Sequence, residues 1–221
     1  IPGIDDLMSG RLNVSQVRRV DVEDLLGRDK IKLNNSGLNK LLNKKVVLVS
    51  GAGGSIGNEL CRQLIKFKPK TIVCLDISEY ALYSLEQSLT NEKIKSKLIY
   101  IVADIKNEER INNIIKRFSP ASVFHAAAYK HVPLMEKENV SEALLNNSLG
   151  TYVLANICQK LKVRKFVLIS TDKAINPTNI MGASKRLAEI FCKKLQNKNG
   201  TEFITVRFGN VLGSSGSVIP L

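Results

Sequence analysis

Residues able to do acid–base chemistry follow one apolar run in the second half of the chain. Residues 165–171 read KFVLIST, and Asp172 and Lys173 come directly after them. A second lysine, Lys185, lies twelve residues after Lys173, and Met181 lies one helical turn before Lys185. To act as an acid near neutral pH, an aspartate must have its ordinary pKa of about 3.9 raised by burial. For the pair taken alone, an exposed ion pair or a helix cap is the favoured interpretation of Asp172 and Lys173, and an acid–base pair is the alternative.

A glycine-rich segment earlier in the chain is typical of phosphate binding. VLVSGAGGSIGNEL places Gly51, Gly54 and Gly57 between an apolar run and an amphipathic one. Glycine permits a tight turn there and lets the backbone approach a pyrophosphate, while the amides of Ser55 and Ile56 would face the phosphates. The spacing predicts a dinucleotide-binding loop, and a glycine-rich turn without a ligand is the alternative.

Two acidic residues end the next two apolar runs. Asp76 follows Gly57 by 19 residues, where a carboxylate would accept hydrogen bonds from the adenosine ribose. No arginine follows Asp76 directly, and a carboxylate repels a 2′-phosphate, so the sequence favours NAD over NADP. Asp104, with Ile105 beside it, would accept from the adenine amino group; capping of the following helix is the alternative for Asp104.

From Lys44 onward, short β-branched runs alternate with amphipathic stretches. Continuous apolar strands indicate burial on both faces, and so a parallel sheet with helices on both sides. Right-handed crossovers then give the order 3-2-1-4-5-6 of an α/β, Rossmann-type doubly wound sheet. The pattern predicts strands over 44–50, 71–76, 97–104, 122–128, 165–171 and 202–208, and helices over 55–67, 79–89, 107–118, 139–147, 148–162 and 179–196.

The first 43 residues differ in pattern, and we expect an N-terminal appendage or linker over 1–43 and a nucleotide-binding domain over 44–221. Within the appendage, residues 20–29 predict a short helix that Asp21 caps and Gly27 ends. Residues 33–43, rich in Asn with Ser and Gly, predict a connector.

The composition narrows the classes of partner that the chain is expected to bind. The net charge of +13 raises the question of nucleic acid, but the basic residues are interspersed with acids and aromatic residues are few, so we expect no nucleic-acid partner. An anionic small molecule or an anionic membrane surface fits the charge equally well.

The chain has four cysteines, Cys61, Cys74, Cys158 and Cys192, and only 2 histidines. Each cysteine stands singly in an apolar pattern, which predicts buried reduced thiols in a cytoplasmic protein and no metal site. No apolar run approaches the about 20 residues of a membrane span.

Several segments together resemble a known family. VFHAAAYKHVPLME (123–136), STDKAINPTNIMGASKR (170–186) and RFGNVLGSSGSVIPL (207–221) are similar to the bacterial nucleotide-sugar 4,6-dehydratases of polysaccharide and glycan biosynthesis, a CapD-like group of extended short-chain dehydrogenases/reductases. Members continue past the equivalent of Leu221 into a region that holds much of the sugar nucleotide. Residues 14–28 resemble the segment that follows a membrane-embedded region in long members. The resemblance implies a fragment with an upstream anchor, at the inner face of the bacterial inner membrane.

The resemblance also implies a reaction and roles. The C4 hydroxyl is oxidised by NAD, water is eliminated across C5 and C6, and the hydride returns to C6. Asp172 would protonate the C6 oxygen, Lys173 would remove the C5 proton, and Lys185 would bond the nicotinamide ribose; for Lys185 a surface lysine is the alternative. The family's Tyr-x-x-x-Lys tyrosine is replaced by Met181, as in its long, membrane-associated branch.

Without that tyrosine, Thr171 is the nearest hydroxyl. We expect it to orient the C4 alcohol while the proton leaves through ordered water, assisted by Lys185 or the cofactor ribose. An inactive homologue is the alternative. Ala126 and Ala127 would leave space for the cofactor, Lys130 could meet a substrate phosphate, and Asn210 could contact nicotinamide or sugar; a structural role in a loop is the alternative for each.

The resemblance therefore predicts a UDP-sugar lyase, most specifically a UDP-N-acetylglucosamine 4,6-dehydratase, working as a homo-oligomer. A nucleotide-sugar 4-epimerase, which needs no base at C5, and a non-catalytic nucleotide-binding module are the alternatives.

Overall fold

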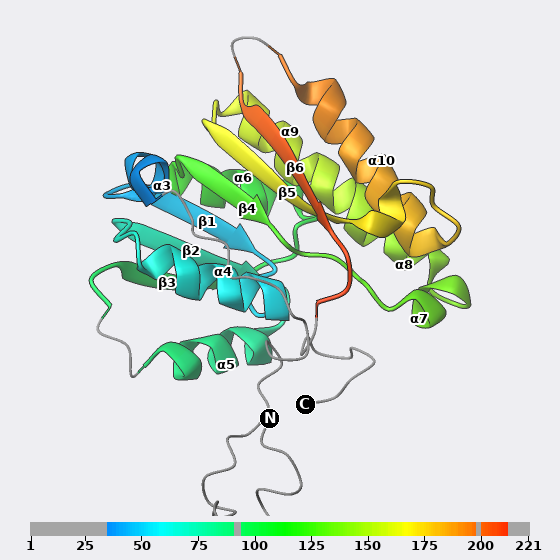
Figure 1. The fold of residues 1–221 in the computed structure, drawn as a ribbon, viewed down its shortest axis with the longest axis horizontal. Helices are drawn as coiled ribbons and strands as arrows, with labels where there is room; N and C mark the ends of the chain where they lie inside the picture. The colour runs from blue at the N-terminus through cyan, green and yellow to red at the C-terminus, as the bar shows by residue number, and fades with distance from the viewer. Residues whose placement is uncertain (1–34, 91–93, 198–199, 212–221) are drawn as a thin grey trace, which may run out of the picture. The chain divides into compact units, whose positions relative to one another are not determined.

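The computed structural model describes residues 35–90, 94–197 and 200–211 (Figure 1). Six parallel strands form one sheet in the order β3-β2-β1-β4-β5-β6, with helices on both faces. This arrangement confirms the predicted doubly wound sheet and its strand order. The predicted helix over 20–29 lies outside the described residues.

Three strands have the predicted bounds and three are shorter. The strands are β1 (Val46–Ser50), β2 (Thr71–Asp76), β3 (Lys97–Val102), β4 (Ser122–His125), β5 (Lys165–Thr171) and β6 (Glu202–Phe208). β1 begins late because Lys44 adopts a left-handed φ of 57° and donates its backbone N–H to Lys68, outside the ladder. β4 ends at His125, which leaves Ala126 and Ala127 in the segment that follows the sheet.

Two apolar layers enclose the sheet. Val47 and Val49 of β1 pack with α3 (Asn35–Leu42), α4 (Ser55–Ile65) and α5 (Glu79–Leu89), whereas Leu48 packs on the opposite face with α6 (Glu108–Phe118), α9 (Gly150–Lys160) and α10 (Ile180–Leu195) (Figure 1). Both faces of the central strands are therefore buried, as the continuous apolar runs predicted. The edge strands β3 and β6 are more exposed.

Two helical segments differ from prediction. Residues 35–42, predicted as part of a connector, form α3, because Leu38, Leu41 and Leu42 recur on one face and pack against the core. The predicted break between helices at 147 and 148 is also wrong. After α7 (Val132–Glu136), α8 (Val140–Ala143), a π-helical segment η2 (Leu144–Leu149) and α9 follow one another without interruption. The wider π-helical turn carries buried Asn146, Asn147 and Ser148.

Candidate active site at the carboxyl edge of the sheet

The glycine loop packs too closely against its surroundings for larger residues. Gly51 has a φ of +71°, and a Cβ there would lie 2.4 Å from the backbone nitrogen of Ala127. A Cβ on Gly57 would lie 1.9 Å from the carbonyl oxygen of Gly51. Gly54 is the N-cap residue of α4 and supplies no side-chain cap, so a ligand can approach the backbone of the first turn, where Ser55 and Ile56 lie. Close packing thus explains the glycines at 51 and 57, and phosphate binding by this loop stays a prediction.

Asp76 holds this loop against the end of β2. Its two carboxylate oxygens accept from the backbone N–H groups of Gly53 and Ser78, both at 3.0 Å. Each oxygen has a second lone pair, with which it can accept from a ribose hydroxyl. Exposed apolar side chains lie at the ends of the paired strands β2 and β3: Ile77 is 53% and Val102 48% exposed. Sequence reasoning missed these two residues.

Asp104 does not cap the following helix. Its Oδ1 accepts from the backbone N–H of Lys106 at 2.8 Å, and its Oδ2 pairs with the Lys106 ammonium at 3.0 Å. Asn107 caps α6 instead, accepting from Arg110 N–H at 2.9 Å, so the capping interpretation of Asp104 is wrong. The side chain of Ile105 is buried in the core, where Gly150 leaves room for it. Only the backbone of Ile105 is left to meet a cofactor.

A buried hydrogen-bond chain that sequence reasoning missed holds the ends of β1 and β4. His125 lies between Ser50 Oγ at 2.7 Å and Thr151 Oγ1 at 2.8 Å. Because Thr151 donates its proton to the carbonyl of Asn147 at 2.6 Å, it accepts from His125 Nε2–H, and His125 Nδ1 accepts from Ser50. Burial, with a smaller contribution from the charge of Lys185, lowers the pKa of His125 to about 3, so the ring is neutral.

Asn147 continues this chain toward α10. Its side chain accepts from Tyr129 N–H at 2.8 Å and donates to Tyr129 O and to Ser184 Oγ, both at 3.0 Å. Ser184 in turn donates to the carbonyl of Met181 at 2.7 Å. The segment that carries Ala126 and Ala127 is thereby tied to α10, and Ala126 also donates to Ser50 O at 2.9 Å. Lys130 lies exposed just beyond.

The predicted acid–base residues form one bonded group at the end of β5. Thr171 Oγ1 donates to Asp172 Oδ1 at 3.0 Å. Lys173 Nζ donates to the same oxygen at 3.1 Å and to Asn210 Oδ1 at 3.0 Å. The bonds from Lys173 and Thr171 lower the pKa of Asp172, whose side chain is 51% exposed. The expectation that burial raises this pKa is wrong for the structure as it stands, because water and two donors reach the carboxylate.

Lys185 and Met181 lie buried on α10. The helix begins at an Asn179 cap, which accepts from Gly182 N–H at 2.8 Å, and Glu136 of α7 accepts from Ile180 N–H. Met181 is 5% and Lys185 4% exposed, so the surface-lysine interpretation is wrong. Within the described part of the chain, Lys185 Nζ has no hydrogen-bond partner. Burial lowers the pKa of Lys185 to about 8, which the partial opposing effects of Cys192 and Glu189 do not offset.

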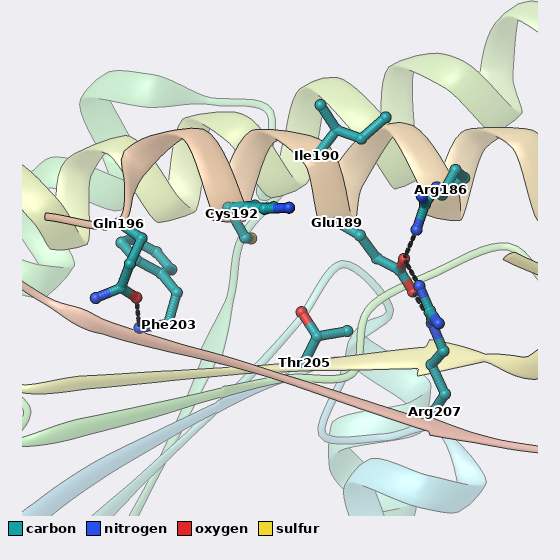
Figure 2. Close-up of a pocket in the computed structure, with 9 residues that line it drawn as sticks. Arg186, Glu189, Ile190, Cys192, Gln196, Phe203, Thr205 and Arg207 are labelled. Carbon is teal, nitrogen blue, oxygen red and sulfur yellow. Dashed lines mark hydrogen bonds and ion pairs between the residues drawn. The ribbon is translucent and has the colours of Figure 1, made fainter. Parts of the chain in front are cut away.

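A groove of about 690 Å³ lies elsewhere, between α10 and β6 (Figure 2), and contains none of the predicted site residues. Its lining residues are Arg186, Glu189, Ile190, Cys192, Lys193, Gln196, Phe203, Thr205 and Arg207.

All four cysteines are buried and free, as predicted. Across 35–90, 94–197 and 200–211, no cluster of three metal-ligating side chains forms. None of the helices in those ranges combines the length and apolar character of a membrane span.

Comparison with known proteins decides the family. A family model described as polysaccharide biosynthesis protein matches residues 47–221. The chain belongs to this polysaccharide biosynthesis protein family. Over its whole length it is 49% identical to the capsular polysaccharide biosynthesis protein CapD of Staphylococcus aureus, and the match covers 37% of that protein. It is also 31% identical to the inverting UDP-N-acetylglucosamine 4,6-dehydratase of Campylobacter jejuni, in a match that covers 81% of this chain and 53% of that protein.

Other relatives of this family member include epimerases. The UDP-glucose 4-epimerase of Rickettsia canadensis is 34% identical over 80% of the chain and 52% of the relative. Among solved structures, Pen from Bacillus thuringiensis superposes with a TM-score of 0.75 at 36% identity, covering 81% of this chain and 54% of that one. The UDP-glucose 4-epimerase of Brucella ovis in complex with NAD, at 21% identity and a TM-score of 0.64, covers 75% of this chain and 52% of that one and shares the fold.

These matches confirm the predicted resemblance to CapD-like nucleotide-sugar dehydratases of the short-chain dehydrogenase/reductase type. The relatives are nucleotide-sugar dehydratases and epimerases, and the chain spans between 37% and 54% of the length of the proteins compared above.

Proposed function

We propose that this chain is the nucleotide-binding portion of an NAD-dependent UDP-sugar 4,6-dehydratase, with UDP-N-acetylglucosamine as substrate. The observation that supports this most is the bonded group of Thr171, Asp172, Lys173 and Asn210, at the same edge of the sheet as the glycine loop. An elimination requires an acid and a base side by side, and this group supplies both. The similarity to the C. jejuni dehydratase supports the substrate class.

The residues present fit a dinucleotide. Gly51 and Gly57 keep the loop tight against its own backbone, where a Cβ would collide, and Lys185 holds a buried ammonium without a partner among the described residues. The glycine loop would hold the pyrophosphate, Asp76 the adenosine ribose, and Lys185 the nicotinamide ribose. Bound NAD supplies hydride transfer, taking a hydride from C4 and returning one to C6. The negative charge of Asp76 disfavours the 2′-phosphate of NADP.

Asp172 and Lys173 together hold the protons that an elimination needs. Transfer of one proton along their 3.1 Å contact converts the ion pair into a carboxylic acid and an amine. The Lys173 amine can then accept the C5 proton while the Asp172 acid gives its proton to the C6 hydroxyl, which leaves as water. The pair is then an ammonium and a carboxylate again. One proton enters and one leaves, so each turnover restores the starting pair.

A bound sugar favours the neutral form of this pair. Removing water costs an ion pair more than it costs a neutral acid and amine, so covering the exposed Asp172 shifts the proton toward its carboxylate. Thr171 would orient the C4 hydroxyl, and Lys185 would keep positive charge beside the C4 oxygen as its proton leaves through water.

Product mass tests the proposal. The full-length enzyme incubated with UDP-N-acetylglucosamine should yield a product lighter by one water. Asp172→Asn and Lys173→Met should each lower the rate of water loss about 10²–10⁴-fold. Both should still reduce bound NAD, since C4 oxidation precedes elimination. Lys137→Met, the same change at an exposed position just after α7, is the matched control.

The same assay separates the alternatives. A 4-epimerase, supported by the Rickettsia relative, would leave the mass of the sugar unchanged and would tolerate Lys173→Met. A non-catalytic module would bind NAD and form no product. Either result would overturn the proposal.

A further inference from the structure

Glu189 lies at the meeting point of three elements. Its carboxylate is nearly buried, with the side chain 6% exposed, on the wall of the groove between α10 and β6 (Figure 2). Ser170 Oγ of β5 donates to Oε1 at 2.7 Å, and Arg207 Nε of β6 donates to the same oxygen at 2.8 Å. Arg207 Nη2 also donates to Oε2, to which Arg186 of α10 donates at 3.2 Å. One carboxylate therefore binds both strands to the helix.

The two strand residues that Glu189 holds are register partners. Ser170 pairs with Arg207 in the β5–β6 ladder, and the next pair is Thr171 with Phe208. The contacts thus grip both strands one residue before Thr171 and three residues before Asn210. The ladder ends one pair later, and the bonded group follows it, in which Lys173 donates to Asn210. Any shift between the strands at Glu189 would change the distances within that group.

Glu189 lies on the same helix as Lys185. The two residues are four positions apart on α10 and so share one face. Cys192 and Glu189, both on the same helix, favour the ammonium form of Lys185, and the charge of Lys185 in turn helps to lower the pKa of His125.

We infer that Glu189 is a positioning residue that sets the geometry of Asp172, Lys173 and Asn210 by clamping the ends of β5 and β6 to α10. The effect of Glu189 on catalysis rests on the proposed function, whereas its effect on the geometry of these residues does not. Glutamine at this position keeps the size and one acceptor, yet it turns an NH₂ group toward the arginine donors and breaks the bidentate pairing.

Kinetics of Glu189→Gln in the full-length enzyme test the role. We expect kcat to fall by about 10²-fold with KM little changed, because misplacement of the acid–base groups acts on the chemical step. Arg207→Gln should have the same effect. The double variant should have about the same kcat as either single variant, because the two substitutions break the same ion pair. Ser170→Ala, which leaves the ion pair intact, should show a smaller loss in the same direction and serves if Glu189→Gln fails to fold.

A second measurement needs no turnover. The pKa of Asp172, followed by carboxyl NMR, should rise toward its ordinary value in Glu189→Gln, because its bonds from Lys173 and Thr171 loosen. Lys193→Gln, which lines the same groove, should leave both kcat and this pKa unchanged. Leu85→Ala, in the apolar layer on the opposite face of the sheet, should lower stability without changing kcat or the pKa of Asp172.

The outcomes separate the two proposals. If Glu189→Gln loses stability but keeps the kcat and the Asp172 pKa of the unmodified enzyme, its role is structural only and the inference is overturned. If the unmodified enzyme forms no product, the proposed function fails, and the NMR measurement alone then decides the role of Glu189.

Discussion

At the scale of single residues, access to water decides the charge of each group in the site. Asp172 is half exposed and receives two hydrogen bonds, so its pKa is lowered. Lys185 is buried and receives no compensating bond from the described residues, so its pKa falls to about 8. The pKa of Lys185 is therefore shifted toward neutrality, whereas the pKa of Asp172 is shifted away from it. Under the proposed function, substrate must bury Asp172 before it can act as an acid.

The pKa of Lys185 leads to a pH prediction. Its ammonium is present below pH about 8 and lost above, so kcat should fall as pH rises through about 8. Lys185→Met should remove this limb from the pH–rate profile. Stability should show the opposite trend: the unfolded lysine keeps its proton to a pH of about 10.4, so the free energy of unfolding should rise between about 8 and about 10.4. A kcat that stays constant up to pH 10 would contradict the assignment.

Thr171 is tested by removing its hydroxyl. Thr171→Ala should lower kcat by about 10²-fold, because the C4 alcohol loses its orienting partner. Thr171→Ser, which keeps the hydroxyl, should retain most of the rate. The pKa of Asp172 should also rise in Thr171→Ala, since one of its two donors is lost. A fully active Thr171→Ala enzyme would remove Thr171 from the mechanism.

At the scale of elements, close packing at the strand ends shapes the site. The glycine loop fits against the segment after β4, and α10 approaches the turn Asp172–Ala174 after β5 so closely that a Cβ on Gly182 would lie 2.4 Å from the carbonyl oxygen of Lys173. The π-helical segment turns Asn147 inward to hold Tyr129 and Ser184. Glycines and inward-facing polar side chains thus let helices come near enough to place Lys173 and Lys185 at one edge.

Two glycine substitutions separate this packing from general effects. Gly57→Ala should weaken NAD binding strongly and lower the melting temperature, because its Cβ would collide with Gly51. Gly37→Ala, inside α3 with no atom within 4 Å of the new Cβ, should raise stability by about 0.5–1 kcal/mol. NAD titration and thermal unfolding measure both effects. Equal NAD affinity in the two variants would contradict the proposed phosphate-binding loop.

At the scale of the whole molecule, exposed apolar side chains gather on the outer surface of two adjacent helical segments. Leu145, Leu149 and Tyr152 are exposed on η2 and α9, and Leu187 and Ile190 on α10. The ring of Tyr152 contacts Phe191 of α10 with centroids 5.2 Å apart, so the two rows are neighbours. Patches of this kind are commonly covered by another chain.

The predicted homo-oligomer is therefore expected to use this surface. Light scattering should report a mass that is a multiple of the 24.5 kDa chain. Leu149→Glu should shift the protein toward the monomer, whereas Lys160→Glu, an exposed change near the end of α9, should not. A monomeric unmodified protein would contradict the prediction. The predicted membrane anchor, expected upstream of residues 14–28, stays a prediction.

Much of the fold could be predicted because its signals are local. Runs such as TIVCLD show double burial directly, and glycine spacing marks the turn after β1. The placement of Thr171, Asp172 and Lys173 at a strand end followed from the same reasoning. Boundaries were less secure: α3 and the π-helical run differ because tertiary packing of Leu42 and Asn147 overrides a polar or connector-like composition.

The sequence by itself determined the α/β architecture, the strand order and the positions of the candidate residues along the chain, since periodicity and glycine act within a few neighbouring residues. Only the tertiary structure decided that Lys185 is buried and Asp172 exposed, that His125 is neutral, and that Glu189 joins three elements. The physical reason is that desolvation and hydrogen bonding depend on which distant segments meet, as where Ser170 and Arg207 converge on one carboxylate from separate strands.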